Sequence, residues 1–72
     1  MKLTIDREAD ALYLELEEGS AVESEELAPG IVVDYDAQNR VVGIEMLNLS
    51  QRSPDADIRR VLIETVDANG RS

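Results

Sequence analysis

The fold is decided by the stretch Gly30-Ile31-Val32-Val33-Asp34-Tyr35-Asp36-Ala37-Gln38-Asn39-Arg40-Val41-Val42-Gly43-Ile44-Glu45-Met46-Leu47. Two apolar segments flank a polar loop at residues 37–40, which predicts a β-hairpin. Antiparallel pairing around this loop gives three opposed pairs: Val33 with Ile44, Ile31 with Met46, and Tyr35 with Val42. One side of the hairpin is then continuously apolar, as expected of strands with a single buried side.

The residues before this hairpin predict three further strands. Lys2 to Ile5 is a short strand, and a polar connection leads from it to Ala11–Leu16. In Ala11–Leu16 every second residue is leucine, which favours a strand because a helix would spread these side chains around its circumference. Ala21 to Leu27 is a weaker strand. It is rich in glutamate, and its pattern leaves the register open.

A C-terminal helix is predicted to begin at Ser53. This serine suits the N-cap, and Pro54 follows at the first helical position, where a missing N–H costs nothing. The spacing of a buried helical stripe is followed by Ile58, Val61, Leu62, Thr65 and Val66. A sixth strand is the competing interpretation, because four of the residues are β-branched: Val61, Ile63, Thr65 and Val66.

The predicted fold class is therefore α+β, an antiparallel meander of four or five strands with one C-terminal helix packed on one face. The helix would cover the side of the sheet made by Leu3, Ile5, Leu12, Leu14, Leu16, Ile31, Val33, Val42, Ile44 and Met46. Residues 1–68 are expected to form a single small domain, and residues 69–72 a flexible tail.

The length and charge of the chain bear on its partners. A domain of 72 residues buries only about 60% of the surface of its unfolded chain. Without cysteine or histidine, a partner subunit is the remaining source of extra stability, so we expect a homodimer. The formal charge of −9 repels nucleic acid and anionic membranes and attracts basic proteins. A basic protein is thus the expected second partner, and nucleic acid and membrane are not expected. The alternative is that the charge only keeps a small domain soluble.

The location expected from the sequence is the cytoplasm. No apolar run approaches the ~20 residues of a membrane span, and the N-terminus lacks the apolar region of a signal peptide.

A candidate interaction face lies on the side of the hairpin opposite the apolar one. It carries Tyr13, Val32, Val41, Gly43, Glu45 and Leu47. A glycine within a strand often marks the close approach of another group, and this face is more apolar than solubility requires. Scattered surface apolar residues, which are normal, are the alternative interpretation. If two copies meet here, Glu45 needs a hydrogen-bond donor, for which Tyr13 and Arg40 are candidates.

The residues needed for catalysis are scarce. The serines have no histidine to activate them, there is no cysteine, and Lys2 is the only lysine. Three acids, Asp6, Glu8 and Asp10, suggest a carboxylate cluster, but the favoured interpretation is a solvated connection in which Asp6 or Asp10 caps a turn. We expect no cofactor, and enzyme activity is disfavoured.

The spacing from Asp34 to Glu45 nearly matches a calcium-binding EF-hand loop. Asn39 occupies the position that needs glycine, and the flanking segments are predicted strands rather than helices. We therefore expect no metal site here either.

Two motifs carry a resemblance to a known family. They are Asp6-x-Glu8-Ala9-Asp10-Ala11-Leu12-Tyr13 and, further on, Asp34-x-Asp36 followed by Val41-x-Gly43-Ile44-Glu45-x-Leu47-x-x-Ser50. The pattern resembles a widespread family of short bacterial and archaeal proteins of unknown function. Three residues depart from it: Asn39 replaces the usual glycine, Met46 replaces isoleucine or valine, and Asn48 replaces aspartate. The resemblance implies no catalytic residue. Some members are similar to the small partner of a toxin-like protein, which implies at most an antitoxin-like role.

The sequence therefore indicates an acidic, non-enzymatic protein-interaction module that forms a homodimer or acts as the antitoxin-like partner of a basic protein. The alternative is a small carboxylate-based enzyme or metal-binding protein.

Overall fold

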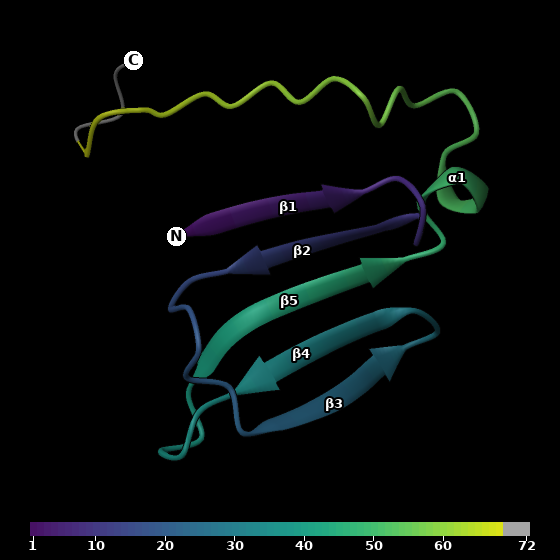
Figure 1. Ribbon diagram of the computed structural model, residues 1–72. Helices are drawn as coiled ribbons and strands as arrows, with labels where there is room; N and C mark the ends of the chain where they lie inside the picture. The colour runs from purple at the N-terminus through teal and green to yellow at the C-terminus, as the bar shows by residue number, and fades with distance from the viewer. Residues whose placement is uncertain (69–72) are drawn as a thin grey trace.

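The computed structural model describes residues 1–68, which are built on one five-stranded antiparallel sheet (Figure 1). The strands are β1 (Lys2–Asp6), β2 (Ala11–Glu15), β3 (Glu23–Ala28), β4 (Ile31–Tyr35) and β5 (Val41–Leu47). A single helical turn, α1 (Leu49–Arg52), follows the last strand. The antiparallel sheet confirms the main part of the predicted fold. The tail predicted at residues 69–72 lies outside the described residues.

The strand order is β1-β2-β5-β4-β3, a meander-like layout that departs from the order along the chain at one place. Strands β3, β4 and β5 follow one another as neighbours, but β5 then pairs with β2. The connection at residues 16–22 therefore runs from β2 past the ends of β5 and β4 to the far edge. Seven residues reach about 23 Å when extended, which exceeds the ~14 Å of three strand spacings.

The central hairpin has the predicted register except at its open end. Val33 pairs with Ile44 and Ile31 with Met46, but Tyr35 lies opposite Val41 instead of Val42. The register shifts after Asp34 because β5 carries one extra residue there, which is the pattern of a β-bulge.

The hairpin turn is closed by the carboxylate of Asp36. Its Oδ1 accepts the backbone N–H groups of Gln38 at 2.9 Å and Arg40 at 2.8 Å, and its Oδ2 accepts Nε–H of Arg40 at 2.8 Å. Asn39 lies at φ 63°, a left-handed conformation that asparagine tolerates better than most residues. The conformation explains why asparagine can occupy this turn position, where the family pattern has glycine.

The pairing register separates two faces of the sheet. Residues opposite each other on paired strands share a face. The apolar face consists of Leu3, Ile5, Leu12, Leu14, Ile31, Val33, Ile44 and Met46. The outer face includes Lys2, Thr4, Tyr13, Glu15, Val32, Asp34, Gly43 and Glu45. At the edge strand β3, every residue is exposed, and its glutamates protect that edge from pairing with other strands.

The prediction of a helix that begins at Ser53 is wrong. Residues 53–68 contain no helix. Ser53 instead ends α1, and its N–H donates to the carbonyl of Leu49 at 3.2 Å. The segment makes isolated turns: Ala56 N–H bonds to Ser53 O at 2.9 Å, and Asp57 Oδ1 accepts the N–H of Arg59 at 3.0 Å. Serine and aspartate side chains compete with helix formation in this way, and a short helix needs packing to persist.

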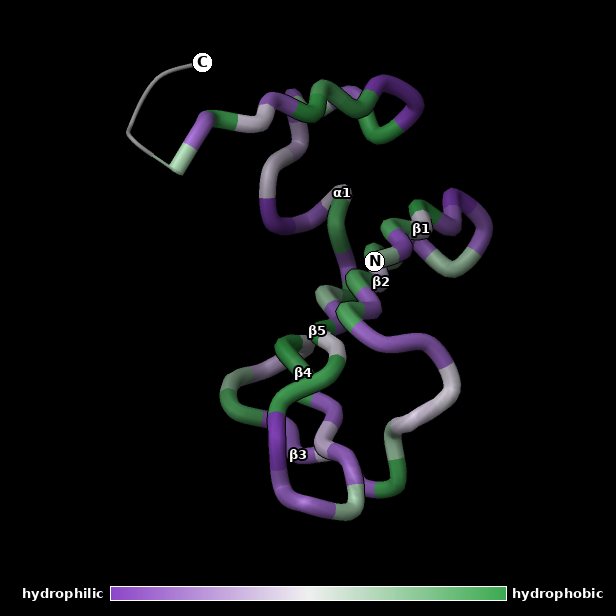
Figure 2. Tube along the Cα trace, turned by 90° about the vertical axis from the view of Figure 1, so that its left-hand side faces the viewer, coloured by the Kyte–Doolittle hydropathy of each residue, from purple (hydrophilic) through white to green (hydrophobic). Residues whose placement is uncertain are grey.

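The predicted stripe therefore does not pack on the sheet. Leu62 is 83% exposed, and Val61 and Val66 are each about half exposed. Only Ile58, at the start of the stripe, is half-buried. The alternative of a sixth strand is not observed in residues 53–68 either. Figures 1 and 2 place this segment beyond β1, away from β3, β4 and β5.

The corner beside α1 is held by two long-range contacts. The carboxylate of Asp10 accepts the backbone N–H of Ser50 at 3.0 Å and its hydroxyl at 2.7 Å. The guanidinium of Arg52 donates Nε–H to Leu47 O at 2.7 Å and also bonds to Pro29 O. These contacts join the β1–β2 turn and the β3–β4 turn to the end of β5.

Candidate functional site

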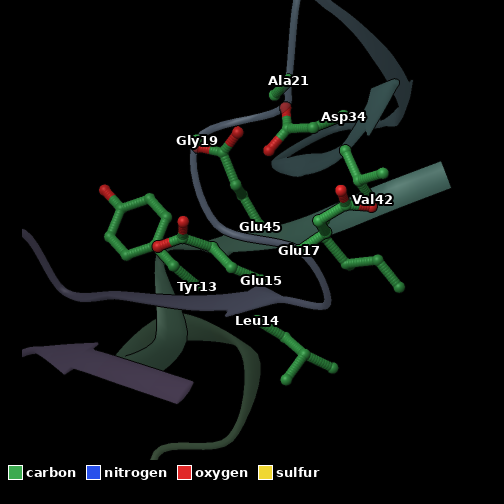
Figure 3. A pocket seen from close by; sticks show the side chains of 11 residues that line it. Tyr13, Leu14, Glu15, Glu17, Gly19, Ala21, Asp34, Val42 and Glu45 are labelled. Carbon is green, nitrogen blue, oxygen red and sulfur yellow. The ribbon is translucent and has the colours of Figure 1, made fainter. Parts of the chain in front are cut away.

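The candidate site is a pocket of about 230 Å³ on the outer face. The sheet contributes Tyr13, Glu15, Asp34 and Glu45 to its lining, and the connection between β2 and β3 contributes Glu17, Gly19 and Ala21. Figure 3 shows these side chains around the loop formed by that connection. The remaining lining residues, also from the sheet, are Leu14, Val42, Gly43 and Ile44. Four of the eleven lining residues are acidic and none is basic, so the pocket is negative.

The connection at residues 16–22 is fixed at both ends. Leu16 N–H bonds to Val42 O at 2.7 Å, and Val22 N–H bonds to Tyr35 O at 2.8 Å. Between these anchors Gly19 adopts φ 77°, a conformation that glycine reaches without strain. The backbone is thereby bent so that it bounds one side of the pocket.

Gly43 makes room for a carboxylate within the chain itself. A Cβ at this position would lie 3.0 Å from Oδ2 of Asp34 and 3.4 Å from the carbonyl oxygen of Leu14. The other oxygen of Asp34 accepts a hydrogen bond from the Ser24 hydroxyl at 2.6 Å. The close approach that the sequence suggested at this glycine is therefore made by Asp34 on the neighbouring strand.

Glu45 points toward Asp34 across the pocket (Figure 3). Burial raises the pKa of Glu45 above its ordinary value, and hydrogen bonding and charge repulsion from Asp34 raise it further. Arg40, one of the two donors expected for Glu45, pairs instead with Asp36 at 2.8 Å. The ion pairs within residues 1–68, Arg40–Asp36 and Arg59–Asp57, both lie outside this pocket.

The six residues of the predicted interaction face are divided by the structure. Tyr13, Gly43 and Glu45 line the pocket, and Val32 pairs with Glu45 on the same face. Leu47 lies at the end of β5 opposite Ala11, and Val41 lies at the bulge, 45% exposed. Whether a partner binds at these residues stays a prediction.

Sequence reasoning missed the other three carboxylates of the pocket. Glu15 and Asp34 carried a usable signal, since strand alternation places them on the same side as Tyr13 and Gly43. Glu17 carried none, because it belongs to a connection whose path depends on the strand order.

The acids of the β1–β2 connection cap turns, as the favoured interpretation expected. Asp6 Oδ1 accepts the N–H of Ala9 at 3.0 Å, and Asp10 caps the start of α1 through Ser50. The residues that match the EF-hand spacing do not lie together. Asp34 and Glu45 lie on the outer face of the sheet, Asp36 closes the hairpin turn, and strands flank the turn on both sides. Within residues 1–68 no group of three acidic side chains is placed to hold a metal ion.

Comparison with known proteins gives one finding. The family described as "Protein of unknown function (DUF2283)" matches residues 2–50, the part of the chain that forms the sheet and its capped corner. Curated proteins give no match, and solved structures give none. No helix in residues 1–68 is long and apolar enough to cross a membrane.

Proposed function

The chain belongs to the DUF2283 family of proteins of unknown function, and we propose that it is a non-enzymatic interaction module whose outer face binds a basic protein. The antitoxin-like role is the specific form of this proposal, with a basic toxin-like protein as the partner and the cytoplasm as the setting. The single observation that carries it is the pocket lined by Glu15, Glu17, Asp34 and Glu45.

Within residues 1–68 these carboxylates form no ion pair, although Lys2 lies opposite Glu15 on the neighbouring strand. Asp34 and Glu45 face each other, and the raised pKa of Glu45 shows that ionising it there is unfavourable. A guanidinium or ammonium group from a partner would stabilise both charges, because an opposite charge favours the ionised carboxylate. The net charge of −9 would also speed the encounter with a basic partner.

The same charges make the outer face a poor place for two copies to meet. A two-fold axis there would set the pocket carboxylates of one copy against the identical ones of the other. Like charges brought together in this way disfavour an interface. We therefore assign the outer face to a basic partner, and the homodimer expected from the sequence to another surface.

The proposal is tested with a double variant of the pocket, Asp34→Asn with Glu45→Gln. A basic protein recovered with the tagged wild-type chain from native cells would be purified, and its binding measured by calorimetry. The double variant should raise the dissociation constant at least about tenfold, as for the loss of partly buried interfacial charges.

The matched control is Glu8→Gln with Glu64→Gln, which removes two negative charges at exposed positions elsewhere. This control should stay within about twofold of the wild type, as for exposed charges. If both double variants raised the dissociation constant equally, the interaction would depend on net charge rather than on the pocket, which would contradict the proposal.

A further inference from the structure

The apolar face of the sheet is left open by the described part of the chain. Within residues 1–68 only three hydrophobic side chains are buried, those of Ala11, Val33 and Val42. Leu3 is 36% exposed and Ile44 37% exposed on the apolar face. The four-residue α1 buries none of its own residues, so it supplies no second layer.

A second apolar surface is open on the C-terminal arm, which we define as residues 54–68. Every residue from 59 to 68 is exposed, including Leu62 and Ile63. Two open apolar surfaces in one small chain are unusual. Since large exposed apolar patches normally mark contact sites, both surfaces are candidates for an interface.

The total surface also exceeds that of a compact chain of this mass. The accessible area is 5728 Å², whereas about 4,450 Å² is typical of an 8.0 kDa monomer. The excess of about 1,300 Å² is more than the ~800 Å² that each partner buries in a standard interface. The radius of gyration, 13.9 Å, is likewise larger than the ~11 Å expected for this length.

We propose that a second copy of this chain covers the apolar face, with the C-terminal arm of each copy packed on the apolar face of the other. The resulting two-fold dimer buries both open surfaces at once. It uses the face opposite the pocket, so it does not depend on the proposed binding of a basic protein.

The arm has the pattern needed for this contact. Ile58, Val61, Leu62, Thr65 and Val66 share one side of a helix, and helices of this length are stabilised mainly by packing their apolar side. The arm would then be extended in the single chain and helical in the dimer, where the partner supplies the packing surface. This reconciles the helical pattern of the sequence with the extended arm of the structure.

The position of the arm favours exchange over folding back. The contacts of Asp10 with Ser50 and of Arg52 with Leu47 fix the chain just before the arm. From this corner the arm leaves beyond β1 (Figures 1 and 2). Its 15 residues are long enough to cross a neighbouring sheet, whose five strands span about 19 Å.

The first test measures mass by light scattering across the micromolar range. The wild type should be a dimer, and Leu62→Asp should raise its dissociation constant at least about tenfold, because it places a charge in an apolar contact. Ile63→Asp is the matched control. Ile63 is also mostly exposed in the single chain, at 72% against 83% for Leu62, but it lies off the stripe. Its substitution should therefore change the dissociation constant much less.

The second test uses the natural absence of cysteine. Chains carrying Ile44→Cys are mixed with chains carrying Leu62→Cys and equilibrated with oxidised glutathione, which is reduced as the interchain disulfide forms. A disulfide between the two different chains is expected. Leu27→Cys, at an exposed site on β3, replaces Ile44→Cys as the control and should give little product.

Three results would overturn the exchanged dimer. They are a monomeric wild type throughout the micromolar range, equal effects of Leu62→Asp and Ile63→Asp, and equal cross-linking from Leu27→Cys and Ile44→Cys. The pocket variant Asp34→Asn with Glu45→Gln should leave the dimer intact, which separates this inference from the proposed function.

Discussion

Glu45 and Asp36 are two carboxylates of one hairpin whose pKa values move in opposite directions. Burial and the nearby Asp34 raise the pKa of Glu45 above its ordinary 4.5. The backbone N–H of Arg40, followed by its side chain and the N–H of Gln38, lowers the pKa of Asp36 below its ordinary 3.8, against the opposing effect of burial. The free energy of unfolding therefore depends on pH at both residues.

The sign differs for the two residues. The stabilisation from neutral Glu45 is fully present below about pH 4.5 and is lost as the pH rises through its raised pKa. The stabilisation from ionised Asp36 is present above about pH 3.8 and is lost as the pH falls through its lowered pKa.

We expect Glu45→Gln to be more stable than the wild type at neutral pH, by less than about 1 kcal/mol, because the site is partly solvated. The difference should shrink as the pH falls toward 4.5. Urea denaturation at a series of pH values measures it. Glu8→Gln, with the same change in charge on an exposed residue, is the control, and an identical pH profile for both variants would contradict the assignment to Glu45.

At the scale of elements, the helix signals in the sequence and the helix in the structure concern different serines. Ser53 has the sequence context of an N-cap, yet the chain uses it to end α1. The start of α1 is capped from a distance by Asp10, through the N–H and the hydroxyl of Ser50.

Ser50→Ala should therefore lower the free energy of unfolding by about 0.5–1.5 kcal/mol, the net contribution of one hydrogen bond. Ser53→Ala should leave it almost unchanged, since Ser53 takes part in the hydrogen bonds of residues 1–68 only through its backbone N–H and carbonyl. Chemical denaturation of the two variants decides between them. A larger loss at Ser53 would mean that a helix begins there after all.

Strands were predictable from the sequence because their signal is local. Alternation in Ala11–Leu16 and the paired apolar segments around residues 37–40 determine the strands, the faces and most of the register. The strand order was not predictable, since it depends on the pairing of β2 with β5 across the chain. The path of residues 16–22, and with it one side of the pocket, follows from that order.

The helix prediction failed for a related reason. An apolar stripe such as Ile58, Val61 and Leu62 indicates that a helix would have one side to bury. It does not indicate that the sheet offers a surface on which that side can pack. Asp57 and Ser53 meanwhile offer local turns that need no such surface.

At the scale of the whole molecule, the charge of −9 on each copy opposes the exchanged dimer. The contact itself is apolar, so salt should strengthen it by screening the repulsion between copies. Between 0.01 M and 0.15 M ionic strength the Debye length falls from about 30 to about 8 Å.

We expect the dissociation constant of the dimer to fall several-fold over this range, as measured by sedimentation equilibrium. Sucrose at equal osmolality is the control and should have a smaller effect. A dimer that weakens as salt is added would be held by ion pairs, contrary to an apolar contact.

The place of β5 between β2 and β4 also governs how the sheet is assembled in time. Leu14 and Ile44 are neighbours although about thirty residues separate them, roughly three times the separation within either hairpin, and closing this longer loop costs about 1 kcal/mol more. A nascent chain leaves the ribosome with β1 and β2 complete and β5 still unmade. The leucines of β2 can therefore pair with β1 early, but they can pair with β5 only when nearly the whole sheet has been synthesised. The β1–β2 and β3–β4 hairpins become one sheet only when β5 is added between them.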